Sequence, residues 1–471
     1  ENTNVLFTNN TANGVSNDIY NVGTMTLTTG NGKSITFDGT IADSTTTAGG
    51  ITVSGSGAVN FNNTVTQKDL TVSGGTVNVN AGNLVITNAI ENSGLMNLTG
   101  GQLDSAISGS GATEISGNVT NNTTLTQGTL QIDNAKKITN KGGKTITVNS
   151  ELANSGEIAN SGVLVINGAT DNDGIISGAG AITFNNNFEN KGTITQNDVE
   201  IAATKELTND ATKAITVNGT LTNSGSIKNE GELNVNAANS LGVITDGTTA
   251  SGTLNTNAGE GNTITVNGTV RQALVHNLSG TLDVNAKITS LITNESGAAI
   301  QSQGENIGGA LTNKGVFTLE GGELSQTVSG NGTMEVSGDA ETTAAISQTS
   351  VTVDTGVELT NGAAITAANI YNAGVVNSTA NNLIGAVSNR GELNISGATA
   401  GTIGNYGGEN GEVNIASGLT VNHEISNQTI NLNGGTLKLA SENLTDGNAF
   451  TTGATSGTVL DLQNDVIGDV V

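Results

Sequence analysis

The chain has 471 residues and a formal net charge of −26, with 66 glycines and no proline, cysteine or tryptophan. Without cysteine it has no disulfide framework, thiolate zinc site or cysteine nucleophile. With 41 acidic residues against 15 basic ones, binding to a nucleic-acid backbone is electrostatically unfavourable. The hydrophobic fraction of 34% and the aromatic fraction of 2% are low for an ordinary globular core of this length.

A short motif recurs along the chain: an aliphatic residue, any residue, Asn, any residue and Gly, followed by alternating aliphatic residues. Its copies, one of which begins with Phe, are residues 19–23, 90–94, 152–156, 158–162, 188–192, 311–315, 370–374 and 387–391. Longer repeats contain it as well, since residues 138–167 align with residues 207–236 without a gap. Part of the same unit returns at residues 263–270. Such self-similarity is typical of repeat architectures.

The local pattern predicts strands and tight turns. Segments such as residues 145–149 alternate apolar and polar side chains, which is typical of a strand with one buried face. Asn and Gly tolerate positive φ, so we expect both residues of the motif to turn the chain sharply. We also expect Asn side chains to stack in successive coils and to hydrogen-bond along the stack. No stretch sustains a 3.6-residue period, so helix is expected to be minor at most.

These patterns predict an all-β fold, a right-handed parallel β-helix (β-solenoid) of roughly 20–25 coils with about three short strands in each. We expect a single continuous solenoid over residues 1–471, with residues 440–471 as a less regular C-terminal end. The absence of proline fits this fold, because every inner coil needs its backbone N–H groups for pairing. Residues 461–471 still alternate aliphatic and polar residues, so no polar cap is evident.

Residues 54–65 (SGSGAVNFNNTV) and 154–167 (NSGEIANSGVLVIN) make the sequence similar to the passenger domains of bacterial autotransporters, especially the adhesin type. The resemblance lies in composition and repeats and extends over nearly the whole chain. It implies secretion, an extracellular location at the bacterial cell surface, and a role in adhesion or aggregation. The lack of cysteine agrees with export through an outer-membrane pore. The chain has no C-terminal barrel, so we expect the anchor to the outer membrane to lie outside it.

Few residues are candidates for catalysis, and we expect no catalytic, cofactor-binding or metal-binding residues. The two histidines, His276 and His423, are too far apart in sequence for a histidine-rich metal site, and we interpret both as residues of a solenoid face or turn. No serine has glycine at both −2 and +2, so the nucleophile elbow of esterases is missing. We therefore predict that the protein is not an enzyme.

Acidic residues gather in two places. Asp171-Asn172-Asp173-Gly174 resembles the first half of a calcium loop, but the later ligands of such a loop are missing. The sequence leaves open weak calcium binding at Asp171 and Asp173 or an ordinary solvated turn. The second cluster, Glu335, Asp339 and Glu341, is expected to be exposed on a strand face or turn.

Two further features are interpreted as structural. Arg390-Gly391-Glu392 coincides with a copy of the turn motif, and we assign it no function. The tyrosines Tyr20, Tyr371 and Tyr406 lie in or beside turn motifs, where packing at a corner is favoured over stacking on a sugar.

The leading functional hypothesis is a secreted or cell-surface structural β-helix that mediates adhesion or self-association. Its expected partners are other copies of itself, side by side or end to end, and a host surface or glycan. One alternative is a self-assembling subunit of an extracellular filament, which imaging would distinguish as continuous fibres. Another is a polysaccharide lyase or hydrolase on the same scaffold, which would need converging carboxylates in a groove.

Overall fold

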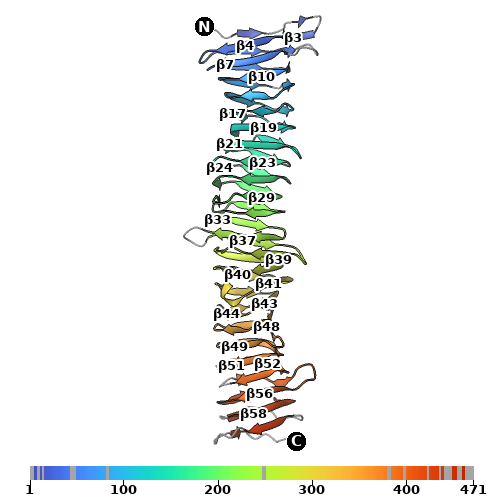
Figure 1. The fold of residues 1–471 in the computed structure, drawn as a ribbon, viewed down its shortest axis with the longest axis vertical. Helices are drawn as coiled ribbons and strands as arrows, with labels where there is room; N and C mark the ends of the chain where they lie inside the picture. The colour runs from blue at the N-terminus through green and yellow to red at the C-terminus, as the bar shows by residue number, and fades with distance from the viewer. Residues whose placement is uncertain are drawn as a thin grey trace. The chain divides into compact units, whose positions relative to one another are not determined.

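The computed structural model describes residues 5–7, 11–12, 15–42, 49–80, 84–246, 251–378, 383–395, 399–421, 424–433, 436–439, 448–452 and 459–461. The chain divides into two units, Glu1–Val235 and Asn236–Val471. In each unit short strands pair in parallel with strands of the preceding and following coil (Figure 1). Together the units contain about 22 turns of a right-handed β-solenoid, with 62% of residues in strands and 1% in helix, as the sequence predicts.

The first unit has three faces, each a stack of parallel strands. The first face contains β4 (Thr24–Thr29), β7 (Gly50–Gly55), β10 (Asp69–Val72), β13 (Ile90–Asn92), β16 (Ile107–Ser108), β19 (Thr124–Ile132), β21 (Thr145–Asn154), β23 (Val163–Ile166), β26 (Ala181–Phe184), β29 (Asp198–Ile201) and β32 (Leu221–Asn223). The second contains β1 (Val5–Phe7), β5 (Ser34–Phe37), β8 (Ala58–Phe61), β11 (Thr76–Val79), β14 (Leu95–Leu98), β17 (Ala112–Ile115), the last parts of β19 and β21, β24 (Thr170–Asn172), β27 (Phe188–Asn190), β30 (Glu206–Asn209) and β33 (Ser226–Asn229).

The third face contains β3 (Val15–Tyr20), β6 (Thr40–Ala42), β9 (Val65–Gln67), β12 (Leu84–Ile86), β15 (Gly101–Leu103), β18 (Val119–Asn121), β20 (Lys137–Asn140), β22 (Glu157–Asn160), β25 (Ile175–Ser177), β28 (Thr193–Gln196), β31 (Ala214–Val217) and β34 (Glu232–Val235). The short strand β2 (Thr11–Ala12) pairs with β3 in antiparallel fashion.

The second unit repeats this plan. One face contains β37 (Thr253–Asn257), β39 (Leu274–Val284), β40 (Leu291–Asn294), β42 (Leu311–Asn313), β45 (Val328–Ser329), β48 (Ile346–Val353), β50 (Ile365–Asn372) and β52 (Leu383–Asn389). The next contains β35 (Asn239–Leu241), β38 (Thr263–Val266), β41 (Ala298–Ser302), β43 (Val316–Leu319), β46 (Thr333–Val336), β55 (Ile403–Asn405) and the last parts of β39, β48, β50 and β52.

The third face of the second unit begins with β36 (Val243–Thr245) and isolated bridges that join Ile244, Val270, Ile288 and Ile307. It also contains β44 (Gly322–Leu324), β47 (Ala340–Thr342), β49 (Glu358–Asn361), β51 (Val375–Ser378), β53 (Glu392–Ile395), β56 (Gly411–Ile415), β58 (Gln428–Leu432) and β60 (Ala449–Thr452). A separate stack contains β54 (Thr399–Ala400), β57 (Leu419–Val421), β59 (Thr436–Leu439) and β61 (Val459–Asp461). A single-turn 3₁₀ helix, η1 (Gly304–Asn306), follows β41.

Side chains alternate between the two faces of each strand, so every second side chain points into the coil. In β22, for example, Ile158 and Asn160 are fully buried, whereas Glu157 and Ala159 face outward and are half-buried. The same pattern fills the core of each unit with Ile, Leu and Val, so a narrow column needs little aromatic bulk. Most of residues 440–471, expected to be less regular, lie outside the described residues.

The Asn of the motif has a different role from the one expected. It does not turn the chain through positive φ: among the described residues, only Ala135, Thr204, Thr212 and Asn427 combine a side chain with positive φ, and none is a motif Asn. Instead it ends a strand with its amide buried, and its Oδ1 can accept a hydrogen bond from the motif Gly, as Asn92 does from Gly94 N–H at 3.1 Å.

The Gly of the motif is required by close approach between coils rather than by its φ. Gly192 has no positive φ, but a Cβ built on it would overlap the carbonyl oxygen of Gly174 in the preceding coil. The expectation of positive φ at this position was therefore wrong. The corner is tight because the chain passes within hydrogen-bonding distance of the coil below it: Gly174 O accepts the N–H of Thr193 at 3.0 Å.

The expected stacking of Asn side chains is confirmed. Four consecutive Nδ2–H to Oδ1 hydrogen bonds of 2.7, 3.0, 2.8 and 2.8 Å join five buried amides, those of Asn154, Asn172, Asn190, Asn209 and Asn229. Buried amides would be costly without partners, and the ladder supplies these partners from identical side chains one coil away.

Glutamine extends the amide ladder across coils that lack the Asn. Between Asn160 and Gln196 the register places Gly178, which has φ of 127° and no side chain. The longer Gln196 accepts the Nδ2–H of Asn160 at 2.7 Å and donates its own Nε2–H to Thr195 O at 2.9 Å. The same arrangement recurs at Asn92–Gly109–Gln127 and at Asn313–Gly330–Gln348.

The close approach of coils at the corner glycines predicts that adding one methyl group there lowers the stability of the fold. We expect Gly192→Ala to lower the free energy of unfolding by about 1–3 kcal/mol or more, because the corner cannot widen without breaking the ladder. Gly142→Ala is the matched control, since its Cβ would lie 3.8 Å from the nearest heavy atom, Ser161 O. Denaturant midpoints of both variants measure the difference, and equal midpoints would contradict the steric explanation.

The hydrogen bond from Asn160 to Gln196 spans two coil spacings, and we call it a glutamine bridge. It predicts that the side chain at position 196 must be as long as Gln. Gln196→Asn removes one methylene, so the amide no longer spans two coil spacings, or about 9.6 Å, to Asn160. We expect a loss of about 1–3 kcal/mol from the buried amide left without its partner. The exposed Gln131→Asn should change stability by less than about 0.5 kcal/mol. Hydrogen exchange of the Asn160 side-chain amide would locate the effect, and unchanged protection would argue against the bridge.

Candidate functional site

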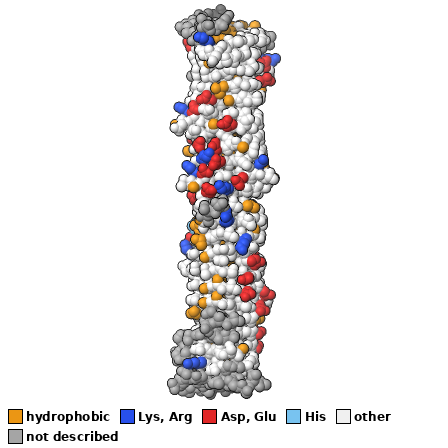
Figure 2. Space-filling model, turned by 90° about the vertical axis from the view of Figure 1, so that its left-hand side faces the viewer, with side chains coloured by type: hydrophobic (Ala, Val, Ile, Leu, Met, Phe, Trp, Pro, Cys, Tyr) orange, Lys and Arg blue, Asp and Glu red, His pale blue; other side chains and the backbone are white. Residues whose placement is uncertain are grey.

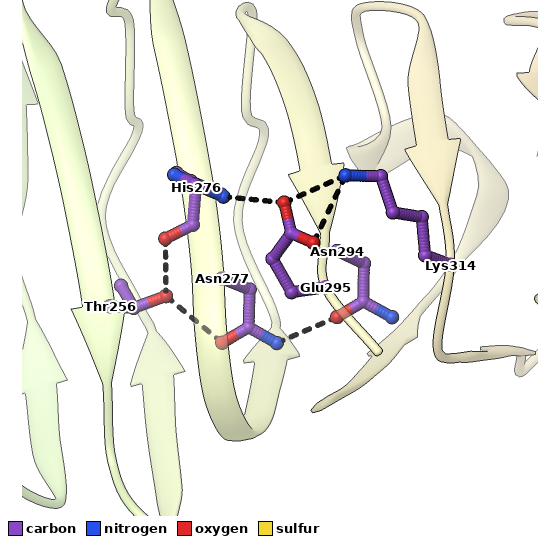
Figure 3. Close-up of polar contacts among 6 residues, drawn as sticks. All are labelled: Thr256, His276, Asn277, Asn294, Glu295 and Lys314. Atoms are coloured by element: carbon purple, nitrogen blue, oxygen red, sulfur yellow. Dashed lines mark hydrogen bonds and ion pairs between the residues drawn. The ribbon is translucent and has the colours of Figure 1, made fainter. Parts of the chain in front are cut away.

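Two rows of polar side chains run along one corner of the second unit, and Figure 3 shows them together. The inner row is buried. Thr256 Oγ1 donates to Asn277 Oδ1 at 3.1 Å, Asn277 donates to Asn294 at 2.9 Å, and Asn294 donates to Asn313 at 2.8 Å. This row comes from the ends of β37, β40 and β42 and the middle of β39, because these four residues occupy the same register position in successive coils.

The outer row is an ion-paired cluster of His276, Glu295 and Lys314 (Figure 3). One carboxylate oxygen of Glu295 lies 2.9 Å from His276 Nε2 and 2.9 Å from Lys314 Nζ, and its other oxygen lies 3.0 Å from the same Nζ. The hydrogen bond from His276, and next that from Lys314, lower the pKa of Glu295 below its ordinary value. The cluster therefore joins three successive coils through one carboxylate.

The interpretation of His276 as a residue of a solenoid face is confirmed, since it lies in β39 with its side chain partly exposed. Its two partners were not anticipated. Lys314 directly follows the motif Asn313, and Glu295 follows Asn294, whose segment has Ser296 where the motif has Gly. Only an alignment that tolerated this difference would have placed Glu295 and Lys314 one above the other. His423 lies outside the described residues.

Asp171 and Asp173 do not share a site. Asp171 borders a hollow together with Glu151, Glu189 and Glu206, whereas Asp173 borders a different one. Within the ranges that the structure describes, no three His, Cys, Asp or Glu side chains are grouped closely enough to hold a metal ion.

A lysine already binds the carboxylate of Asp171. Lys191 Nζ lies 2.7 Å from Asp171 and 2.9 Å from Glu189, and these two hydrogen bonds raise the pKa of Lys191. Burial, and next the charge of Glu189, raise the pKa of nearby Asp210. Figure 2 shows acidic and basic side chains gathered on the surface of the first unit. The arrangement neutralises carboxylates with an ammonium group in place of a cation from solution.

The second acidic cluster is not a single site either. Glu335 lies in β46 and Glu341 in β47, which belong to different sheets. Asp339 accepts the backbone N–H of Glu358 at 2.9 Å. Burial, and next the charge of Asp354, raise the pKa of Glu335.

The three tyrosines divide into one exposed side chain and one packed pair. Tyr20 is 58% exposed. The rings of Tyr371 and Tyr406 lie 5.2 Å apart between centroids, and the guanidinium of Arg390 lies 4.9 Å from the Tyr406 centroid. Arg390 also donates to Thr355 Oγ1 at 3.3 Å. Packing at a corner, as expected, describes Tyr371 and Tyr406.

One ion pair joins a buried carboxylate to a partly exposed arginine and was not predicted from the sequence. The carboxylate of Asp246 is fully buried, accepts the N–H of Ser251 at 3.1 Å and lies 3.2 Å from Arg271 Nε. Asp246 lies outside the repeated motif, so no sequence pattern marks it. No helix in the described part of the chain is long and apolar enough to cross a membrane.

The Glu295 cluster predicts a pH-dependent contribution to stability. Because the pKa of Glu295 is lowered by folding, its contribution is present above the pKa of the unfolded chain and is lost as pH falls through the folded value. Glu295→Gln should therefore lower the melting temperature at pH 7, with a cost of about 1 kcal/mol or less. The gap to wild type should close below about pH 4.

Glu260→Gln is the matched control, since Glu260 is exposed and no ion pair involves it within the described residues. Its melting temperature should follow that of wild type at every pH. A constant gap for Glu295→Gln from pH 7 to pH 3 would contradict the ion-pair explanation.

No family model, no curated protein and no solved structure matches this chain.

Proposed function

We propose that the protein is a structural β-solenoid of a bacterial cell surface or of its surroundings, similar to an adhesin-type autotransporter passenger, and that it acts by adhesion and self-association rather than by catalysis. The observation that supports this proposal most is an ordered column of outward amides on the third face of the second unit. Its members are Asn377, Asn394, Asn414 and Asn431.

The column is held together by its own hydrogen bonds. Asn394 donates to Asn377 at 2.8 Å, Asn414 donates to Asn394 at 2.8 Å, and Asn431 donates to Asn414 at 2.7 Å. Side chains fixed in this way lose little conformational entropy when a partner binds. Because the same group repeats at every coil, many weak and similar contacts can add up to a stable association.

A similar outward column occurs in the first unit. Asn167 donates to Asn149 and Asn185 donates to Asn167, both at 2.8 Å. Polar columns on both units favour lateral contact with other copies of the chain. The net charge of −26 opposes such contact until counterions screen it, because the Debye length shortens from about 30 Å at 0.01 M salt to about 8 Å at 0.15 M.

Self-association should therefore depend on salt. Light scattering should detect monomers at about 0.01 M salt and larger species as the salt concentration passes about 0.15 M. Asn394→Asp combined with Asn414→Asp adds like charges within the column, and we expect this variant to need more salt to associate. A chain that stays monomeric at every ionic strength would contradict the proposal.

Thr293→Asp combined with Thr312→Asp is the control for net charge. These residues are register neighbours on another face of the same unit, so the control adds two charges away from the amide column. An equal shift in both double variants would assign the effect to net charge alone.

A further inference from the structure

A trough lies along one corner of the first unit, where the second face meets the third. It encloses about 700 Å³. Its floor is formed by three tight corners that contain Gly156, Gly174 and Gly192. Its two ends are formed by wider turns that end at Lys136 and Lys213.

Local sequence explains why the corner is hollow here. The two wider turns have four residues each, closed by hydrogen bonds of 3.0 Å from Lys136 N to Asp133 O and from Lys213 N to Asp210 O. Ala135 and Thr212 take positive φ of 58° and 67° to make these turns. The three Asn-x-Gly corners between them turn the chain without extra residues. The trough is thus the gap between two protruding turns, about 19 Å apart at four coil spacings of about 4.8 Å.

Two lysines mark the ends of this trough. Residues 136–228 hold eight of the 15 basic residues, all lysines, but others of these, such as Lys144 and Lys205, lie at other corners. Lys136 and Lys213 line opposite ends of the trough. No carboxylate of the described residues lies within ion-pair distance of either.

The centre of the trough carries the opposite charge. Asp173 and Glu157 line it between the two lysines, and Glu157 is paired with Lys137 at 2.9 Å. The hydroxyl residues Ser155 and Thr193 also line it, as does Ile175, which is 47% exposed. Among the side chains that line the trough, the charge pattern is positive, negative and positive, with hydroxyl and apolar groups between.

We propose that this trough binds a linear acidic glycan in which charged and neutral sugars alternate. Two charged sugars separated by one neutral sugar lie closer together than the two turns, and the flexible four-carbon stems of Lys136 and Lys213 let their ammonium groups reach inward to pair with the carboxylate or sulfate groups. A neutral sugar between them lies over the floor, with its hydroxyls beside Ser155, Asp173 and Thr193 and its C–H groups against Ile175. Asp173 repels a chain with a charge on every unit, such as a nucleic acid or an acidic peptide.

This inference rests on the proposed adhesive function and gives adhesion a ligand class. It involves the first unit and a lysine pair, whereas the self-association test concerns amides of the second unit and salt. If the glycans do not bind, the prediction of salt-dependent association is unaffected. If the chain does not self-associate, the prediction of glycan binding is unaffected.

The test measures binding by isothermal titration calorimetry at about 0.15 M salt, where non-specific attraction is screened. The probes are a hyaluronate octasaccharide, with carboxylates only, a chondroitin sulfate octasaccharide, with added sulfates, and a neutral chitin oligosaccharide. We expect the two acidic probes to bind and the neutral one not to. The stronger of the two acidic probes identifies carboxylate or sulfate as the preferred group. Failure of both acidic probes to bind would overturn the proposal.

Lys136→Gln combined with Lys213→Gln should weaken binding about tenfold or more, because both charge-assisted contacts are lost. The control, Lys144→Gln combined with Lys205→Gln, removes the same charge from wide turns at other corners of the first unit. It should change affinity by less than about threefold. Circular dichroism and melting curves verify that each variant folds.

Besides failure of both acidic probes to bind, three further outcomes would overturn the proposal. The first is that the trough variant keeps wild-type affinity. The second is that the control variant loses as much affinity as the trough variant. The third is that a poly-glutamate peptide binds as tightly as the acidic glycans, which would assign the trough to an acidic peptide.

Discussion

The spacing between hydrogen-bonded strands, about 4.8 Å, constrains nearly every residue choice in this chain. Coils that stack at this distance bring the backbone of one corner against the backbone of the next, so a motif Gly such as Gly192 has no room for a side chain. The same spacing suits an amide that donates to an identical amide one coil away, which makes Asn tolerable in the core. Where one coil lacks the Asn, the next uses the longer Gln.

The stacking rule also explains the distribution of charge. Outward side chains at one register position form a column, and each carboxylate in it meets the residue one coil above or below. Glu295 meets His276 and Lys314 in this way, and Asp171 meets Lys191. Other columns place one carboxylate above another, as in the register pairs Glu323–Glu341 and Glu392–Glu412, so only part of the acidic charge is neutralised by a basic side chain.

The repeating part of the structure could be predicted from sequence because it depends on local rules. Alternation, the Asn-x-Gly spacing and the absence of proline were enough for the fold class and for the stacking of Asn side chains. The role of the motif Gly could not be predicted from its φ preference, because the constraint on Gly192 is the carbonyl of Gly174 in another coil. The candidate sites depend on register in the same way. Lys136 and Lys213 lie at the two ends of one trough only because the three coils between them turn without extra residues.

The glutamine bridges have a consequence for how such a chain can change over generations. A solenoid grows and shrinks by duplication or loss of whole coils, and new copies diverge at different rates. A coil that has Gly at the Asn position, as at Gly178, would interrupt a ladder that joined only adjacent coils. Gln196, one coil beyond Gly178, accepts a hydrogen bond from Asn160 across that coil. A single longer side chain in the next coil is therefore enough to keep the ladder connected. The three occurrences of this pair, in both units, make it a reusable form of compensation, through which a repetitive sequence can drift without losing its core.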